Sequence, residues 1–312
     1  MIALRARSLS PAAQAWLSED RPVWVLHLSA RACSLIDDRD RVLALVTEQI
    51  GGGPFNVVVP PIIFPLHVTP ESSVDLAPES IRVGGLVVDL SAAAPWDPHP
   101  KWSRLRQRRA WVESCLPRLR EVLRMHAPLA SLAALVVDLP APASAVEAAL
   151  LQTAQAHWAA LAEGLQKGDR EGCLAGAAGL AGLGDGLTPA GDDWLLGGAL
   201  AAHLKDPSDP ACALLLEAVR EVARHTTPLS AAWLRAAAVG ECAAPWHKLF
   251  DACLGADEER VARAARLLVC QGYTSGASAL AGFVGVLSEG GDQPKGGSAH
   301  SARSRRRRGT ST

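Results

Sequence analysis

The chain has 312 residues, of which 49% are hydrophobic and 20% are charged, as is typical of a soluble globular protein of one large or two modest domains. Its formal net charge of −1 argues against a strongly basic folded surface, so we expect no nucleic-acid partner. No apolar run approaches the roughly 18 residues that a membrane span needs, and no signal pattern opens the chain, so we expect no membrane partner and a cytoplasmic location.

Short runs rich in β-branched residues dominate the first part of the chain. They lie at 22–37, 41–50, 55–64 and 81–91, and turn-forming stretches such as DDRD and GGGP separate them. These runs predict a β-rich, antiparallel N-terminal domain, and a small barrel is one form that it could take. Three prolines in the stretch WDPHP and just before it indicate a linker between 91 and 102. We therefore place the first domain at 1–97.

Helical periodicity begins at Lys101. In the segment 101–126, Pro117 is expected to kink or split the helix. One face of that segment carries apolar side chains, namely Leu105, Trp111, Cys115, Leu119 and Val122. Further helices are predicted at 143–167, 170–183, 189–204, 210–225, 228–239, 244–254, 258–270 and 277–288. The fold class is therefore α+β, with a mainly α-helical domain at 98–289.

Two further features of the sequence, the C-terminal segment and the cysteines, are assigned no role in a catalytic or binding site. The segment 290–312 combines Gly, Ser and Pro with four consecutive arginines, and we expect it to be a disordered basic tail. A solvated extension is favoured over an arm that contacts nucleic acid or membrane. The seven cysteines show no metal-binding spacing, so we expect reduced, buried thiols.

A glycine-rich segment at 182–200, GLGDGLTPAGDDWLLGGAL, combines helix-start signals with three aspartates. Thr188 is predicted to be the N-cap, which puts Asp192 and Asp193 in the first helical turn. The glycines of the segment indicate unusual backbone dihedrals or close backbone approach. The spacing matches neither a P-loop nor a dinucleotide-binding fingerprint.

Two later segments repeat this combination of hydroxyl groups and a helix start. They are TTPLSAAWLRAAAVGE, beginning at Thr226, and GYTSGASALAGF, beginning at Gly272. Three such helix starts can hold one small anion through free backbone N–H groups. The aspartates would then bind a bridging Mg²⁺ or accept hydrogen bonds from a carbamoyl NH₂ group. The alternative is three ordinary helix caps at separate places.

These three segments, in this order, resemble the oxamate carbamoyltransferase AllH-like family, and the resemblance runs from about Val23 to about Leu287. It implies a subunit of a multi-protein assembly in allantoin (purine nitrogen) catabolism. Such an assembly exchanges a carbamoyl group between oxalurate and phosphate, giving oxamate and carbamoyl phosphate, and it includes partner subunits that look like acyl-CoA synthetases. The third segment departs from the family pattern, since Tyr273 and Ala277 stand where a His and an Asp are often found.

Carbamoyl transfer passes through a tetrahedral oxyanion, which needs oriented donors more than a covalent nucleophile. The candidate catalytic residues are Asp192, Asp193 and His225, where His225 acts as an acid or base or pairs with an aspartate. The two aspartates are also the candidate ligands of Mg²⁺. The candidate residues that bind the small anionic substrate are Gly184, Asp185, Gly186, Thr188, Gly191, Thr226, Thr227, Ser230, Thr274, Ser275 and Gly276. A non-catalytic subunit that binds a metabolite or supports assembly is the alternative.

Overall fold

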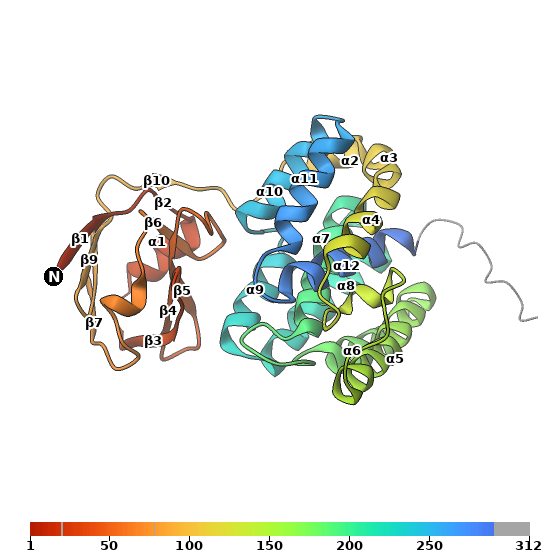
Figure 1. Cartoon of the computed structure of the whole chain (residues 1–312), viewed down its shortest axis with the longest axis horizontal. Helices are drawn as coiled ribbons and strands as arrows, with labels where there is room; N and C mark the ends of the chain where they lie inside the picture. Colours follow the sequence, from red (N-terminus) through yellow and green to blue (C-terminus); the bar gives the residue numbers. More distant parts are fainter. Residues whose placement is uncertain (20, 78, 290–312) are drawn as a thin grey trace, which may run out of the picture.

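The computed structural model of the chain describes residues 1–19, 21–77 and 79–289. A β-rich N-terminal part is followed by a helical part (Figure 1), which confirms the predicted α+β class. The domain boundary near residue 97 stays a prediction. The tail predicted at 290–312 lies outside the described residues.

Two sheets make up the N-terminal part. The order of the first is β1 (Ile2–Arg5), β9 (Leu86–Asp89), β8 (Ser80–Val83) and β7 (Val74–Ala77). The order of the second is β10 (Ala94–Pro95), β2 (Ser8–Leu9), β6 (Asn56–Val59), β5 (Val42–Thr47), β4 (Ala32–Asp37) and β3 (Val23–Leu28). The predicted 22–37 run thus contains two strands, β3 and β4.

The pairing corrects two expectations about this part. β1 pairs with β9, β10 with β2, and β5 with β6 in parallel, so the sheets are mixed rather than antiparallel. The described strands form two open sheets and no barrel, and the start of the chain connects the two sheets. The Ala6 N–H donates to Asp89 of the first sheet, and the Arg7 N–H donates to Val58 of the second. The first strand segment therefore passes from one sheet to the other, and the edge strands stay separate.

Strand β5 is buried along its whole length because both of its faces are covered. Leu43 and Leu45 face the core of the N-terminal part, which the helix α1 (Pro11–Leu17) also joins. Val42, Ala44 and Val46 belong to a second cluster that includes three side chains of the helical part: Leu229, Ala232 and Trp233. This alternation follows from the two-residue period of a strand. It joins the two parts through apolar contact.

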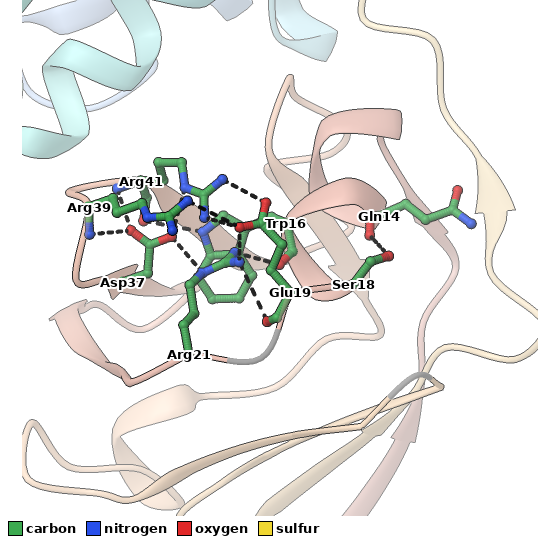
Figure 2. A network of polar contacts seen from close by, with 8 residues as sticks. All are labelled: Gln14, Trp16, Ser18, Glu19, Arg21, Asp37, Arg39 and Arg41. Atoms are coloured by element: carbon green, nitrogen blue, oxygen red, sulfur yellow. Dashed lines mark hydrogen bonds and ion pairs between the residues drawn. The ribbon is translucent and has the colours of Figure 1, made fainter.

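An ion-pair network fixes the end of α1 to the turn between β4 and β5 (Figure 2). The Arg21 Nε lies 2.6 Å from the buried Asp37 Oδ2, and the Arg21 guanidinium lies 4.5 Å from the ring centroid of Trp16. Arg41 contacts Asp37 and also binds Glu19 through two hydrogen bonds of 2.7 and 2.8 Å. The bonds from Arg41 lower the pKa of Glu19 to about 2. Paired, hydrogen-bonded charges are the arrangement in which burial of such groups is tolerated.

The helical part begins with three short helices in place of one long one. They are α2 (Trp102–Gln107), α3 (Arg109–Ser114) and α4 (Leu116–His126). Pro117 lies in the first turn of α4, where its missing N–H costs nothing, so the predicted split is confirmed. Leu105, Cys115 and Leu119 are fully buried, as their common face predicts.

The remaining helices agree with the predicted ranges to within a few residues. They are α5 (Ala145–Lys167), α6 (Arg170–Leu180), α7 (Ala190–Lys205), α8 (Pro210–Val222), α9 (Pro228–Ala238), α10 (Ala244–Leu254), α11 (Glu258–Val269) and α12 (Ser275–Ser288). Short 3-10 turns lie at η1 (Phe64–Leu66), η2 (Leu132–Leu135) and η3 (Ala223–His225). Among the described helices, none is both long and apolar enough to cross a membrane.

Helices α7 and α12 form the centre of the helical part, and they approach each other very closely. A Cβ atom on Gly197 would lie 1.8 Å from the Ala279 carbonyl oxygen, and one on Gly282 would lie 2.1 Å from the Trp194 carbonyl oxygen. Only glycine fits at such contacts. Almost every residue of α7 is buried, which is typical of a helix that other elements surround.

Candidate functional site

Asp192 joins the first glycine-rich segment to the second. It lies in the first turn of α7 and is 2% exposed. Its Oδ1 accepts a hydrogen bond from the Gly182 N–H at 2.9 Å, and its Oδ2 accepts from the hydroxyls of Ser230, at 2.7 Å, and Thr226. Burial raises the pKa of Asp192, and the three donors act in the opposite direction. Both oxygens of this carboxylate are therefore used within the protein.

The third segment joins the first through a pair of hydroxyl groups. Thr188 Oγ1 lies 2.8 Å from Ser275 Oγ. The expectation that Thr188 caps α7 is wrong, because Pro189 takes the N-cap position and the Thr188 side chain turns to Ser275 instead. Thr227 is the N-cap of α9, where it accepts from the Ser230 N–H and donates to the Leu187 carbonyl. Side-chain hydrogen bonds thus link the starts of α7, α9 and α12.

The glycines of these segments meet two different structural needs. Gly184 and Gly186 have φ angles of +114° and +91°, which L side chains rarely adopt. Gly191 and Gly276 lie in helices, where an added Cβ would come within 2.0 Å of the Leu180 carbonyl oxygen or 1.8 Å of the Leu268 carbonyl oxygen. Backbone geometry accounts for all four, and a role for them in substrate binding stays a prediction.

Several candidate residues lie away from this set of hydrogen bonds. Asp185 and Gly186 are exposed in the loop before α7. His225 is exposed, and its Nε2 accepts a hydrogen bond of 3.1 Å from the neighbouring Arg224. Among the described contacts, no hydrogen bond connects His225 with either aspartate. Thr274 precedes α12 and makes no side-chain cap bond.

A cavity of about 220 Å³ lies between the helical part and the end of the second sheet. Four of the candidate residues line it: Thr188, Asp193, Ser275 and Gly276. The N-terminal part contributes Ile50 and Asn56. The other lining residues are Leu196, Trp233, Glu241, Cys242, Ala243, Pro245, Trp246, Leu268, Gln271, Gly272 and Ala279.

Two lining side chains hold buried polar atoms for which the described part of the chain offers no hydrogen-bond partner. They are Oδ2 of Asp193, a residue 6% exposed, and Oδ1 of Asn56, which is 2% exposed. Burial raises the pKa of Asp193 well above its usual range, and the Ser275 hydroxyl opposes this effect. Buried polar groups are rarely left unpaired, so these two atoms need a partner that the described chain does not supply.

Asn56 and the whole contribution of the N-terminal part to the cavity were not predicted from the sequence. One local signal was available, since Asn56 is the polar residue at the start of the apolar stretch NVVV. An amide buried among β-branched residues needs a reason. No comparable signal in the sequence indicates that Trp233 and Trp246 line the cavity, because their position depends on how the two parts pack.

The Mg²⁺ site stays a prediction. Asp193 offers one unpaired carboxylate oxygen, whereas protein donors occupy both oxygens of Asp192. Within the described ranges, no cluster of three or more His, Cys, Asp or Glu side chains forms a ready set of metal ligands. All seven cysteines are free thiols, and Cys270 is the exposed one.

Comparison with known proteins supports the resemblance seen in the three segments. Residues 180–287 match the family model described as oxamate carbamoyltransferase subunit AllH, which confirms the resemblance for this stretch of the chain. The matched region begins just before the glycine-rich loop and ends within α12, so it contains all three segments. A search of curated proteins and a search of solved structures found no match.

Proposed function

We propose that this chain is a subunit of a carbamoyltransferase-type complex that acts on oxalurate or oxamate and carbamoyl phosphate in allantoin catabolism in the cytoplasm. One observation carries the proposal: the matched region 180–287 holds three segments whose side chains are hydrogen-bonded to one another beside a cavity. The word subunit in the family description supports a complex with other proteins. The resemblance suggests that the partners look like acyl-CoA synthetases.

The reaction sets clear requirements for such a site. A phosphate oxygen attacks the carbamoyl carbon of oxalurate, a new C–O bond forms, the C–N bond to the oxamate nitrogen breaks, and a proton moves to that nitrogen. The site must accept hydrogen bonds from the carbamoyl NH₂ group and donate to the developing oxyanion. Asp193 is suited to the first task, and the Thr188 and Ser275 hydroxyls to the second. Asp192 ties the first segment, which carries Thr188 and Asp193, to the second.

The experiment that tests this function is reconstitution of the complex. The full chain is co-expressed with the candidate partner proteins, and carbamoyl phosphate is measured after oxalurate and phosphate are added. We expect activity that is lost when the chain is left out, and that falls at least tenfold in Thr188→Val, which keeps the shape of the side chain and removes the hydroxyl. If the partners transfer the carbamoyl group equally well without the chain, the alternative of a non-catalytic binding or assembly subunit replaces the proposal.

A further inference from the structure

We infer that a groove between helices α4 and α11 docks an acidic, amphipathic helix of a partner protein. Side chains of these two helices line the groove, which encloses about 220 Å³. The inference rests on the proposed function only for the identification of that partner as another subunit of the complex. No described residue lines both this α4–α11 groove and the cavity that contains Asp193. The docking surface is therefore separate from the candidate site.

Helices α4 and α11 lie side by side and run in the same direction (Figure 1). Near the start of both helices, Arg118 of α4 donates a hydrogen bond of 2.5 Å to Glu121 and one of 2.7 Å to Glu259 of α11. One guanidinium therefore neutralises both carboxylates of the groove. His126 and Arg266 line the groove from the last turns of the same two helices, so the basic ends of both helices meet there.

Two arginines of the groove have no counter-charge in the described part of the chain. Arg263 and Arg266 are exposed, and within the described ranges neither side chain forms an ion pair or a hydrogen bond. They lie three residues apart on one helix, where like charges disfavour folding slightly. The helix dipole accounts for Arg266 in the last turn but not for Arg263 in the middle of α11. Carboxylates of a partner would offset this charge.

The apolar part of the lining favours a protein segment over a nucleic acid or a free phosphate. Val122 is buried and Ala262 is half-buried, so these two side chains form the floor, while Met125 beside them is 69% exposed. Met and Arg are both enriched at protein interfaces, and a flexible Met adapts to the side chain that covers it. The carboxylates of Glu121 and Glu259 would repel a polyphosphate that ran along the groove. An apolar floor with charged rims suits an amphipathic helix.

The distribution of charge also defines the occupant. It needs carboxylates near Arg263 and Arg266, an apolar side chain over Met125, and no acidic residue near Glu121 and Glu259. The formal net charge of the chain is −1, so the basic end of the groove is a local feature rather than a property of the whole surface. Electrostatic attraction therefore directs an acidic partner to this face.

The first test measures binding of two synthetic helical peptides to the full chain by fluorescence anisotropy. In one peptide, glutamates and a leucine share a face, and in the other glutamines replace the glutamates. We expect the acidic peptide to bind about tenfold more tightly, with an affinity that falls as the salt concentration rises. Replacing Arg263 and Arg266 together by Gln should remove this preference, and Met125→Gln should weaken binding of both peptides. The matched control, Arg124→Gln with Arg260→Gln, removes as much charge from the same helices outside the groove and should change little.

The second test uses the candidate partner proteins of the reconstituted complex. Arg263→Glu with Arg266→Glu should weaken their association with the chain about tenfold, as measured by size-exclusion chromatography with light scattering. The acidic peptide should compete with the partner for the wild-type chain. Since both arginines are exposed, the melting temperature of the variant should match that of the wild type.

Several results would overturn the inference. They are equal binding of the two peptides, binding of neither, equal effects of the groove and control substitutions, and a complex that assembles equally well with the charge-reversed chain. Displacement of the acidic peptide by an equal concentration of inorganic pyrophosphate assigns the groove to a small anion instead, and tighter binding of an oligonucleotide of equal charge assigns it to nucleic acid. Failure of the proposed function is separate. Peptide binding that depends on Arg263 and Arg266, in a chain that adds nothing to carbamoyl transfer, rejects the function and keeps the inference.

Discussion

Asp192 and Asp193 are neighbours in one helical turn, and both are buried, yet their carboxylates have different surroundings. Asp192 accepts three hydrogen bonds from protein donors, whereas Asp193 has an oxygen without a partner in the described chain and lines the cavity. The helix-start pattern in the sequence predicted a site role for both residues and did not distinguish their surroundings. The difference depends on Gly182, Thr226 and Ser230, which only the folded chain brings to Asp192.

This contrast predicts that substitution of the two aspartates affects the free energy of unfolding differently. Asp192→Ala leaves three donors without their acceptor, so we expect the free energy of unfolding to fall by about 3 kcal/mol. Asp193→Asn removes a carboxyl whose pKa is raised by burial, so we expect no loss. Urea denaturation at neutral pH measures both values. Similar losses in the two variants would contradict the assignment of Asp192 as the structural residue of the pair.

The difference in stability between the wild type and Asp193→Asn should change with pH in a predictable direction. The pKa of Asp193 is raised in the folded protein, so above about pH 4 the unfolded chain ionises first and the wild type loses stability as the pH rises. Asp193→Asn lacks this loss. Its advantage over the wild type should therefore grow between pH 4 and pH 7. The exposed Asp185→Asn is the matched control, and an equal trend in that variant would show that the effect does not come from burial.

At the level of elements, the helices were predictable and much of the sheet structure was not. The apolar period and the helix-start signals gave the ranges of α5 to α12 to within a few residues. Strands β2 and β10 have two residues each, too few for a period-two pattern to appear. Parallel pairing of β1 with β9 joins segments about 80 residues apart, and no local pattern encodes such a pairing.

Substitution of two adjacent glycines of α7, Gly197 and Gly198, tests the close packing of this helix against α12. Gly197→Ala would force a Cβ against the Ala279 carbonyl oxygen, so we expect a loss of about 3 kcal/mol or more in the free energy of unfolding. Gly198→Ala is the matched control. Its Cβ would lie 3.2 Å from a methyl group of Val286, and alanine favours the helix over glycine, so the net change should be within about 1 kcal/mol. Thermal or urea denaturation of both variants measures the difference, and equal effects would contradict the close-packing explanation.

At the level of the whole molecule, the cavity exists because the N-terminal part packs against the helical part. The Ala244 N–H donates to Gly52, and Phe55 lies with its ring centroid 4.5 Å from that of Trp233. The three kinds of residue that indicated a site in the sequence, namely glycines, hydroxyls and aspartates, all lie on the helical side. The sequence therefore indicated one wall of the cavity and not the wall that carries Asn56.

The contact between Phe55 and Trp233 predicts an effect on binding at a distance. Phe55 does not line the cavity, but Trp233 does, so Phe55→Leu should loosen that indole and weaken binding of oxamate, a ligand of the proposed function, several-fold. Phe64→Leu is the matched control, because Phe64 is fully buried in the core of the N-terminal part and belongs to a different cluster from Trp233. Both changes should lower the free energy of unfolding by about 1 kcal/mol. Only Phe55→Leu should change the affinity of the folded protein, as measured by calorimetry well below the melting temperature. Equal affinity in the two variants would mean that the N-terminal part does not shape the cavity through this contact.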